Sequence, residues 1–324
     1  LLMESSAVPV RTAVPMEVHD EPCVVLMSST GLLARTAGTA PSDDASHEQR
    51  STHDVIVSAT PATTRGEFGI VTSAGRVMRL SVVDLPSIPA VSGTPALSAG
   101  APLGAFVDLP RGEVPLCLTS LDDSGGIALA TARGVVKRVI PDALQNKDSW
   151  EVIRLDEGDR VVGASRLPDA DAADVELVFI TSDAQLLRIP ASSVRPQGRA
   201  AAGMSGIKLS AGAEVIAFTA VRPSVDAVVV TVAGSAAALP GTEPGTVKVT
   251  PLDQYPGKGR ATGGVRCHKF RSGEDRLILA WAGTGPARAA TASGGPLGLS
   301  DPDPRRDATG VPATAPMSSV AGAL

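Results

Sequence analysis

Arginine recurs at one position of a repeated strand-turn-strand pattern. In four repeats it lies four residues after the turn position, as Arg35, Arg79, Arg138 and Arg188, whereas the fifth repeat has Ala238 there. Because side chains alternate across a strand, the four arginines are expected to share one face of their strands. Such cations can neutralise nucleic-acid phosphates, or they can simply prevent aggregation at a solvated sheet edge. The pattern therefore predicts a phosphate-binding surface or a charged edge, with the fifth repeat a poor phosphate contact.

Two glycine-containing loops carry a second group of cations. Residues 194–209 and residues 255–266 both contain a basic residue, a Gly-Arg pair, two or three small residues, a glycine and a short strand-like run. These loops and the remaining cations of the repeats complete the candidate phosphate ligands: Arg76, Arg133, Lys137, Arg195, Arg199, Lys208, Lys258, Arg260, Arg266 and Lys269.

The repeats themselves predict the architecture that positions these cations. Turn positions fall at residues 31, 75, 134, 184, 234 and 283, with steps of 44, 59, 50, 50 and 49 residues. One hairpin cannot bury its apolar face alone, and a four-stranded unit of about 40 to 50 residues is the size of a propeller blade. The chain is therefore predicted to be all-β, a ring of six blades, each a four-stranded antiparallel sheet.

The repeats occupy one continuous stretch of the chain. Residues 16–290 are predicted to form the six-bladed domain, residues 1–15 a lead-in, and residues 291–324, rich in proline, glycine and alanine, a flexible tail. An alternative is that part of this tail returns to the first blade and closes the ring. Residues 37–54 are polar and are expected to form a surface loop.

Composition predicts a globular chain with an acidic body. Hydrophobic residues make up 43% and charged residues 19% of the 324 residues, enough to bury a sizeable core. Twenty-nine basic and 34 acidic residues give a net charge of −5, so a phosphate-binding face would be a local positive patch with salt-sensitive binding. Aromatic residues make up only 2%, which argues against stacking on single strands.

The cysteines and the hydropathy of the chain indicate the cellular compartment in which the protein is expected to act. Cys23, Cys117 and Cys267 are far apart and lack metal-binding spacing, which favours buried thiols in a reducing compartment over disulfides or zinc. No apolar run of 18 residues and no secretory signal occur, so no membrane partner is expected. A cytoplasmic location without a bound metal follows.

Several segments together resemble one family. The two Gly-Arg loops, and residues 53–86 with their Gly-Ile-Val-Thr-Ser-Ala-Gly-Arg-Val-Met-Arg-Leu core, are similar to blade signatures of the C-terminal domain of bacterial type IIA topoisomerase A subunits, the family of DNA gyrase and topoisomerase IV. The resemblance spans about residues 16–290. It implies a six-bladed β-pinwheel, in which the strand connection differs from that of a propeller.

The resemblance also implies a function. The rim of such a domain binds and bends duplex DNA and presents a segment for strand passage to a holoenzyme containing the catalytic core and the B subunit. ATP and magnesium act in that holoenzyme, at the nucleoid, whereas this segment needs no cofactor.

One departure from the family pattern concerns the loop after the first hairpin. The A subunits of gyrase carry a basic, glycine-rich box there, of the kind Gln-Arg-Arg-Gly-Gly-Lys-Gly, whereas residues 37–54 of this chain are acidic and contain no such run. The resemblance therefore points to the topoisomerase IV type, which relaxes and decatenates, or to a gyrase paralogue with that activity.

No catalytic residue is expected in this segment. The family cleaves DNA with a tyrosine assisted by an arginine, but the single tyrosine, Tyr255, follows Asp253-Gln254 without a preceding arginine and is predicted to be structural. Phosphate-loop and nucleophile-elbow motifs are absent from the sequence. The alternative function is a β-propeller that binds protein through an acidic face and has no DNA role. A propeller hydrolase with inward carboxylates has little support.

Overall fold

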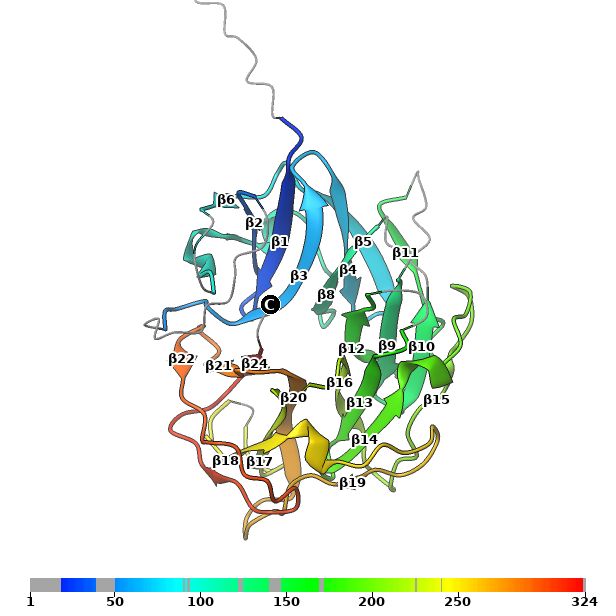
Figure 1. The fold of residues 1–324 in the computed structure, drawn as a ribbon, viewed down its shortest axis with the longest axis vertical. Helices are drawn as coiled ribbons and strands as arrows, with labels where there is room; N and C mark the ends of the chain where they lie inside the picture. Colours follow the sequence, from blue (N-terminus) through cyan, green and yellow to red (C-terminus); the bar gives the residue numbers. More distant parts are fainter. Residues whose placement is uncertain are drawn as a thin grey trace, which may run out of the picture.

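Six β-sheets stand around a common axis in this protein (Figure 1). The computed structural model describes residues 19–38, 50–89, 91, 94–121, 125–139, 147–168, 172–224, 226–239 and 241–322. The predicted lead-in, residues 1–15, and most of the predicted surface loop 37–54 lie outside these ranges. The predicted all-β, six-bladed fold is confirmed.

Each blade is built on a hairpin, and in the first five blades the two strands of the hairpin form the middle of the sheet. The six hairpins are β1 (Pro22–Ser28) with β2 (Leu32–Thr36), β4 (Glu67–Thr72) with β5 (Arg76–Ser81), β9 (Ile127–Thr131) with β10 (Val135–Val139), β13 (Glu176–Thr181) with β14 (Gln185–Pro190), β17 (Ala227–Gly234) with β18 (Thr246–Pro251), and β21 (Arg288–Ala290) with β22 (Pro296–Leu297). We number the blades 1 to 6 in this order.

An inner strand lines the ring axis in every blade. In blade order these strands are β3 (Ile56–Thr63), β8 (Pro115–Ser120), β12 (Val161–Arg166), β16 (Val215–Val221), β20 (Arg276–Thr284) and β24 (Ser319–Ala321). Inner strands of successive blades lie side by side, and β24 lies beside β3, so the ring is closed (Figure 1).

A short outer strand completes the first five sheets. These strands are β6 (Ser87–Ile88) and β7 (Ala101–Pro102) in blade 1, then β11 (Ser149–Glu151), β15 (Met204–Ser205), β19 (Val265–Arg266) and β23 (Val311–Pro312). Four single-turn 3-10 helices lie in the described connections: η1 (Leu97–Ala99), η2 (Leu103–Ala105), η3 (Ala191–Ser193) and η4 (Leu252–Gln254). Pairing is antiparallel throughout except between β2 and β6, and the described part of blade 6 has three strands.

Each outer strand comes from the chain that follows the next hairpin. For example, β11 follows the hairpin of blade 3 but pairs with β5 of blade 2, after which the chain returns as inner strand β12 of blade 3. Strand exchange of this kind ties consecutive blades together. It is also the pinwheel connection that the family resemblance implied.

The hairpin turns follow a Thr-x-x-Gly pattern with a physical basis. The amide of the fourth residue donates to the carbonyl of the first, as Gly75 does to Thr72 (2.9 Å), and this fourth residue has positive φ, 73° at Gly75 and 59° at Ala184. Glycine adopts this conformation without steric cost. The threonine hydroxyl also accepts an amide, as Thr181 Oγ1 does from Gln185 (3.0 Å).

The last two repeats of the sequence prediction are misplaced. Gly234 ends β17, β18 begins only at Thr246, and the strand position equivalent to Arg188 is Val249 rather than Ala238. Residues 280–288 do not form a hairpin, since β20 pairs with β17 of blade 5 whereas β21 belongs to blade 6. The true sixth turn is Thr291 to Gly294, which has the same Thr-x-x-Gly pattern.

The expected flexible tail is therefore part of the ring. It contains β22, β23 and β24, of which β23 pairs with blade 5 and β24 forms the inner strand of blade 6. This arrangement matches the alternative left open by the sequence, in which part of the tail returns to the first blade and closes the ring. Most of the tail could not fold locally because its strands pair with distant residues.

Ring closure repeats the contact that links neighbouring blades. The carbonyl of each hairpin turn accepts the amide of a residue that follows the next hairpin: Gly31 from Leu103, Gly75 from Val152, Gly134 from Ile207, Ala184 from Cys267 and Gly245 from Ala313. At blade 6 the donor is His53, which follows the first hairpin (2.9 Å to Gly294). The segment 50–55 thus completes the cycle.

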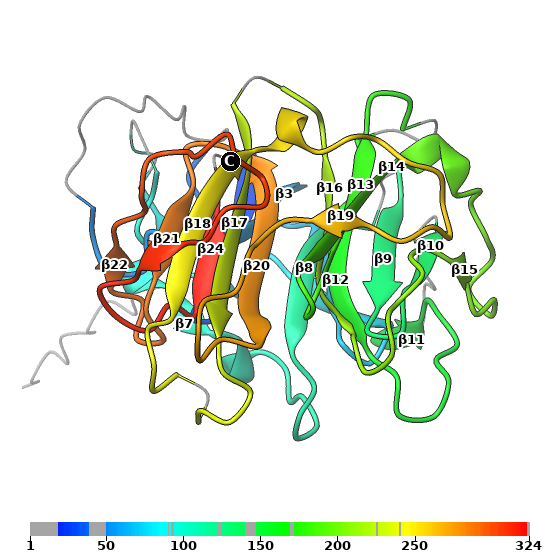
Figure 2. The same cartoon turned by 90° about the horizontal axis from the view of Figure 1, so that it is seen from below.

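The apolar core lies between adjacent blades. Valine, leucine and isoleucine from facing sheets make up most of it, and the pair Phe179 and Phe218, with ring centroids 5.0 Å apart, packs between blades 3 and 4. The outer surface of the hairpins is left for the exchanged segments, which run around the perimeter (Figure 2).

Candidate nucleic-acid interface

The predicted phosphate ligands fall into three groups by exposure. Six are exposed: Arg133, Arg195, Lys208, Arg260, Arg266 and Lys269. Six are partly buried: Arg35, Arg76, Arg79, Arg188, Arg199 and Lys258. The two remaining residues are buried: Lys137 and Arg138.

The structure removes Lys137 and Arg138 from the candidate ligands. Lys137 is 0% exposed, and its Nζ donates to the carbonyls of Val152 (2.7 Å), Arg199 (2.9 Å) and Ala201 (2.8 Å). Arg138 is 4% exposed. Its Nη1 donates to the carbonyls of Ala191, in η3, and Val194, the residue directly after η3. The exchanged outer segment covers both side chains, which a strand pattern does not reveal.

The four repeated arginines occupy the equivalent strand position, as predicted. Three of them form ion pairs or hydrogen bonds with other residues of the protein. Besides Arg138, Arg79 pairs with Glu67 (2.7 Å) and lies over the ring of Trp150, 5.7 Å from its centroid. Arg188 lies 2.9 Å from Glu176 and donates to the carbonyl of Leu252 in η4 (2.9 Å). Since the exchanged segments cover this position, it is not a free sheet edge, and Arg79, Arg138 and Arg188 bind groups of the protein there.

The two Gly-Arg loops form one continuous surface on the rim. We call residues 194–208 the blade-3 loop and residues 255–271 the blade-4 loop, after the hairpins that they cross. The amide of Lys208 donates to the carbonyl of Thr262 (3.0 Å), and Arg260 Nη1 donates to the carbonyl of Ser205 (2.6 Å). Figure 2 shows β15 and β19, which belong to these loops, in long segments outside the hairpins.

Positive charge is concentrated on these two loops. Together they contain eight basic residues and no acidic residue, although the whole chain has a net charge of −5. By contrast, residues 147–160 on blades 2 and 3 contain three basic and five acidic residues. The basic residues are therefore unevenly distributed among these rim segments.

A recess extends this surface toward blade 2. It has a volume of about 450 Å³ and is lined by Arg76, Lys147, Ser149, Trp150 and Arg199, among others. Glu113 neutralises Arg76 through two contacts of 2.7 Å, which raise the arginine pKa through the side-chain hydrogen bond. The recess thus places Lys147 beside Arg199 of the blade-3 loop.

Sequence reasoning missed one equivalent residue, Arg305. The amides of Gln197, Lys258 and Asp303 all donate to the carbonyl at the repeated strand position of their blade, so the residues two places later, Arg199, Arg260 and Arg305, are equivalent. The signal is that Arg305 lies five residues before the Gly310-Val311 pair, much as Arg260 lies four residues before Gly264-Val265.

The loop around Arg305 differs in charge, however. Residues 301–310, the blade-5 loop, contain three aspartates and two arginines. Arg305 forms two hydrogen bonds with Asp303 (3.0 and 2.8 Å). The acid-free, basic surface therefore ends at blade 4.

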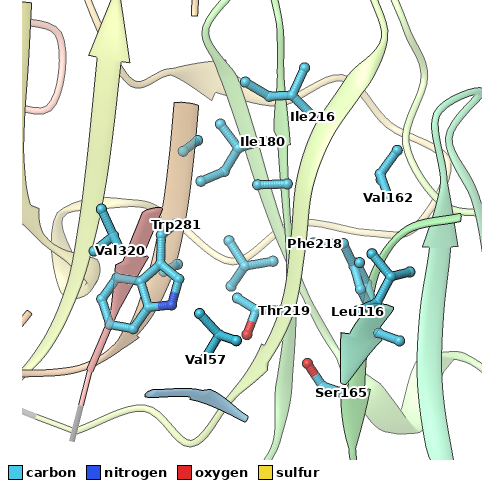
Figure 3. Close-up of a pocket in the computed structure, with 16 residues that line it drawn as sticks. Val57, Leu116, Val162, Ser165, Ile180, Ile216, Phe218, Thr219, Trp281 and Val320 are labelled. Atoms are coloured by element: carbon cyan, nitrogen blue, oxygen red, sulfur yellow. The ribbon is translucent and has the colours of Figure 1, made fainter. Parts of the chain in front are cut away.

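The cavity on the ring axis is lined mainly by apolar side chains. It has a volume of about 230 Å³ and is lined by side chains of the inner strands and β13, including Val57, Leu116, Phe218, Trp281 and Val320 (Figure 3). No carboxylate is among its described lining residues.

The remaining candidate reactive groups are buried. Tyr255 is 1% exposed, and burial raises its pKa strongly, as expected for a structural residue. All three cysteines are buried and free, as predicted, and burial raises the pKa of Cys117 to about 12. Among the described residues, no group of His, Cys, Asp and Glu side chains could hold a metal ion, and no helix is long and apolar enough to cross a membrane.

Comparison with known proteins identifies similar sequences. Residues 70–97, 151–168, 176–222 and 241–280 match the family described as DNA gyrase C-terminal domain, beta-propeller. The chain is 29% identical to the A subunit of DNA gyrase from Escherichia coli K12 over 198 residues (60% of this chain, 20% of that protein). It is 30% identical to the A subunit of DNA gyrase from Staphylococcus aureus NCTC 8325 over 227 residues (64% and 23%). The chain thus spans about a fifth of the length of these relatives.

Two solved structures share the fold. The C-terminal domain of DNA topoisomerase IV aligns with a TM-score of 0.67 at 18% identity, covering 94% of both chains. The DNA gyrase A C-terminal domain aligns with a TM-score of 0.58 at 17% identity, covering 93% of this chain and 99% of that one.

Proposed function

Because this chain belongs to the family of DNA gyrase A C-terminal β-propeller domains, we propose that it binds duplex DNA through the blade-3 and blade-4 loops and bends it. The observation that carries the proposal is the concentration of eight cations and no acid on two loops that are hydrogen-bonded to each other. Contacts to phosphate supply affinity without reading sequence. The domain has no catalytic role of its own in this proposal.

Curvature of the rim supports bending. The two loops cross neighbouring blades of a closed ring, so a duplex that touches both follows a curved surface. The recess with Lys147 and Arg199 extends the path toward blade 2, whereas the blade-5 loop, with its three aspartates, ends it. Bending a duplex costs free energy that further phosphate contacts must repay.

In the intact enzyme, the domain would present a DNA segment for strand passage. The partners would be the catalytic core and B subunit of a type IIA topoisomerase, which uses ATP and magnesium, in the cytoplasm at the nucleoid. We assign the enzyme to the relaxing and decatenating, topoisomerase IV-like type. Support comes from residues 37–54, which contain four acidic residues and one arginine in place of a basic, glycine-rich box.

A salt series with charge-reversed variants tests the proposal. The double variant Lys208→Glu with Arg266→Glu changes one exposed cation in each loop. Loss of two phosphate contacts should reduce the slope of log affinity against log salt by about 1.8 and weaken binding to a 40-base-pair duplex roughly sixtyfold at 0.1 M salt. Fluorescence anisotropy measures both quantities, and the loss should be equal for duplexes of unrelated sequence.

The matched control is Arg65→Glu with Arg111→Glu. These two arginines are also exposed and lie outside both loops, so the variant makes the same change in net charge. It should retain most of the affinity. Equal losses in both variants would overturn the site, because long-range charge alone would explain them. A wild-type chain that binds a protein partner but no duplex at low salt would favour the protein-interaction alternative.

A further inference from the structure

A buried ammonium group lies directly beneath the blade-3 loop. Lys137 projects from β10, and its three carbonyl partners come from two separate segments: Val152, which follows β11, and Arg199 and Ala201 in the loop. All three N to O distances lie between 2.7 and 2.9 Å. An ammonium has three donors, so this geometry satisfies all of them.

We propose that Lys137 is a positioning residue for DNA binding, which fixes the backbone of the blade-3 loop so that Arg199 and its neighbours face the duplex. The inference rests on the proposed function. Lys137 would not touch DNA itself, because it is fully buried. It acts through the two loop carbonyls that lie on either side of residue 200.

The energetics of burial favour such a role over one in stability alone. An ammonium removed from water costs free energy unless its hydrogen bonds replace hydration, and an apolar residue of similar volume is often equally stable there. Burial lowers the pKa of Lys137 to about 8, which reflects this cost. Blade 4 has Leu187 at the equivalent position, also fully buried, so the fold does not itself require a lysine.

Blade 5 provides an independent comparison. Lys248 occupies the same position on β18, is 2% exposed, and donates to the carbonyls of Arg305 and Arg306 in the blade-5 loop. The same device therefore recurs beneath an equivalent loop, the one with three aspartates. Substitution of Lys248 should disturb a loop of the same kind without changing the affinity for DNA.

The experiment compares Lys137→Met with Lys248→Met. Met has nearly the length of lysine but no donor, and Lys137→Leu, which copies blade 4, serves if Lys137→Met does not fold. The Lys137 variants should lose affinity for the duplex about eightfold at 0.1 M salt, with a salt slope lower by about 0.9, as for one lost phosphate contact. Lys248→Met should bind as the wild type does.

Two further readouts separate positioning from general destabilisation. In a chain with both Arg199→Ala and Lys208→Ala, adding Lys137→Met should cause no further loss of affinity. In a chain with both Lys258→Ala and Arg260→Ala, adding Lys137→Met should cause its full loss of affinity. In the free chain, amide exchange should accelerate at residues 197–203 but not at residues 258–264.

The outcomes are distinguishable. Wild-type affinity in the Lys137 variants, or an equal loss in both neutralised backgrounds, would overturn the inference while leaving the proposed function intact. Absence of duplex binding by the wild type would overturn the proposed function, and amide exchange would then still decide whether Lys137 orders the loop.

Discussion

Asp54→Ala is expected to lower the free energy of unfolding by about 3 kcal/mol, the low end for removing one partner of a buried ion pair. Asp54 is only 2% exposed and accepts from Arg50 at 2.7 and 2.9 Å, with Arg288 of blade 6 at 3.8 Å. Without the carboxylate, both arginines lose their ion pair with Asp54. Because Arg50 is 28% exposed, water offsets part of the loss.

The effect should be localised at the closure of the ring. Arg50 also donates to the carbonyls of Ala289 (3.0 Å) and Leu297 (3.1 Å), so the Asp54 carboxylate orients the side chain that joins segment 50–55 to blade 6. Amide exchange in β21 and β22 should therefore increase more than exchange in blades 3 and 4. Urea unfolding measures the stability change.

Asp303→Ala is the matched control. It also removes an aspartate from an arginine pair, but its Arg305 partner is 76% exposed, and surface pairs contribute about 0 to 1 kcal/mol. A loss for Asp54→Ala no greater than for Asp303→Ala would contradict the role of this pair in ring closure.

Acid should destabilise the ring by up to about 3 kcal/mol between pH 6.5 and pH 4 through one buried histidine. His268 is 1% exposed; its Nδ1 lies 2.9 Å from Thr231 Oγ1, and its Nε2 accepts the amide of Gly310 (3.1 Å). Burial, aided by the positive charge of Lys248, lowers its pKa from 6.5 to about 4. A proton on Nε2 would remove the acceptor for Gly310.

The sign follows from proton uptake. Between pH 4 and pH 6.5 the unfolded chain binds a proton at this histidine that the folded chain does not, so stability falls as pH falls through that window and is fully present above it. His268→Gln, which can still accept from Gly310, should abolish this part of the pH dependence.

Urea unfolding at a series of pH values tests the role of His268. The exposed His19, changed to glutamine, is the control and should leave the slope unchanged. A slope in His268→Gln equal to that of the wild type would assign the acid sensitivity to other groups.

Local sequence signals were sufficient for the class and the number of blades. The Thr-x-x-Gly turns at Gly75 and Gly134 depend only on a positive φ and on contacts within four residues, so they are readable from the chain. The shared Gly-Arg plan of the two loops is also a local property. It made Arg199 and Arg260 candidate phosphate ligands from the sequence alone.

Pairing over long distances decided the rest. The sixth blade needs β24 beside β21 and residue 53 beside Gly294, and no local pattern encodes contacts across such separations. Likewise, Lys137 looks like an exposed strand cation until a loop more than 60 residues later covers it. Local backbone preference thus specified the hairpins, whereas strand exchange and closure of the ring determined which cations remain in contact with water.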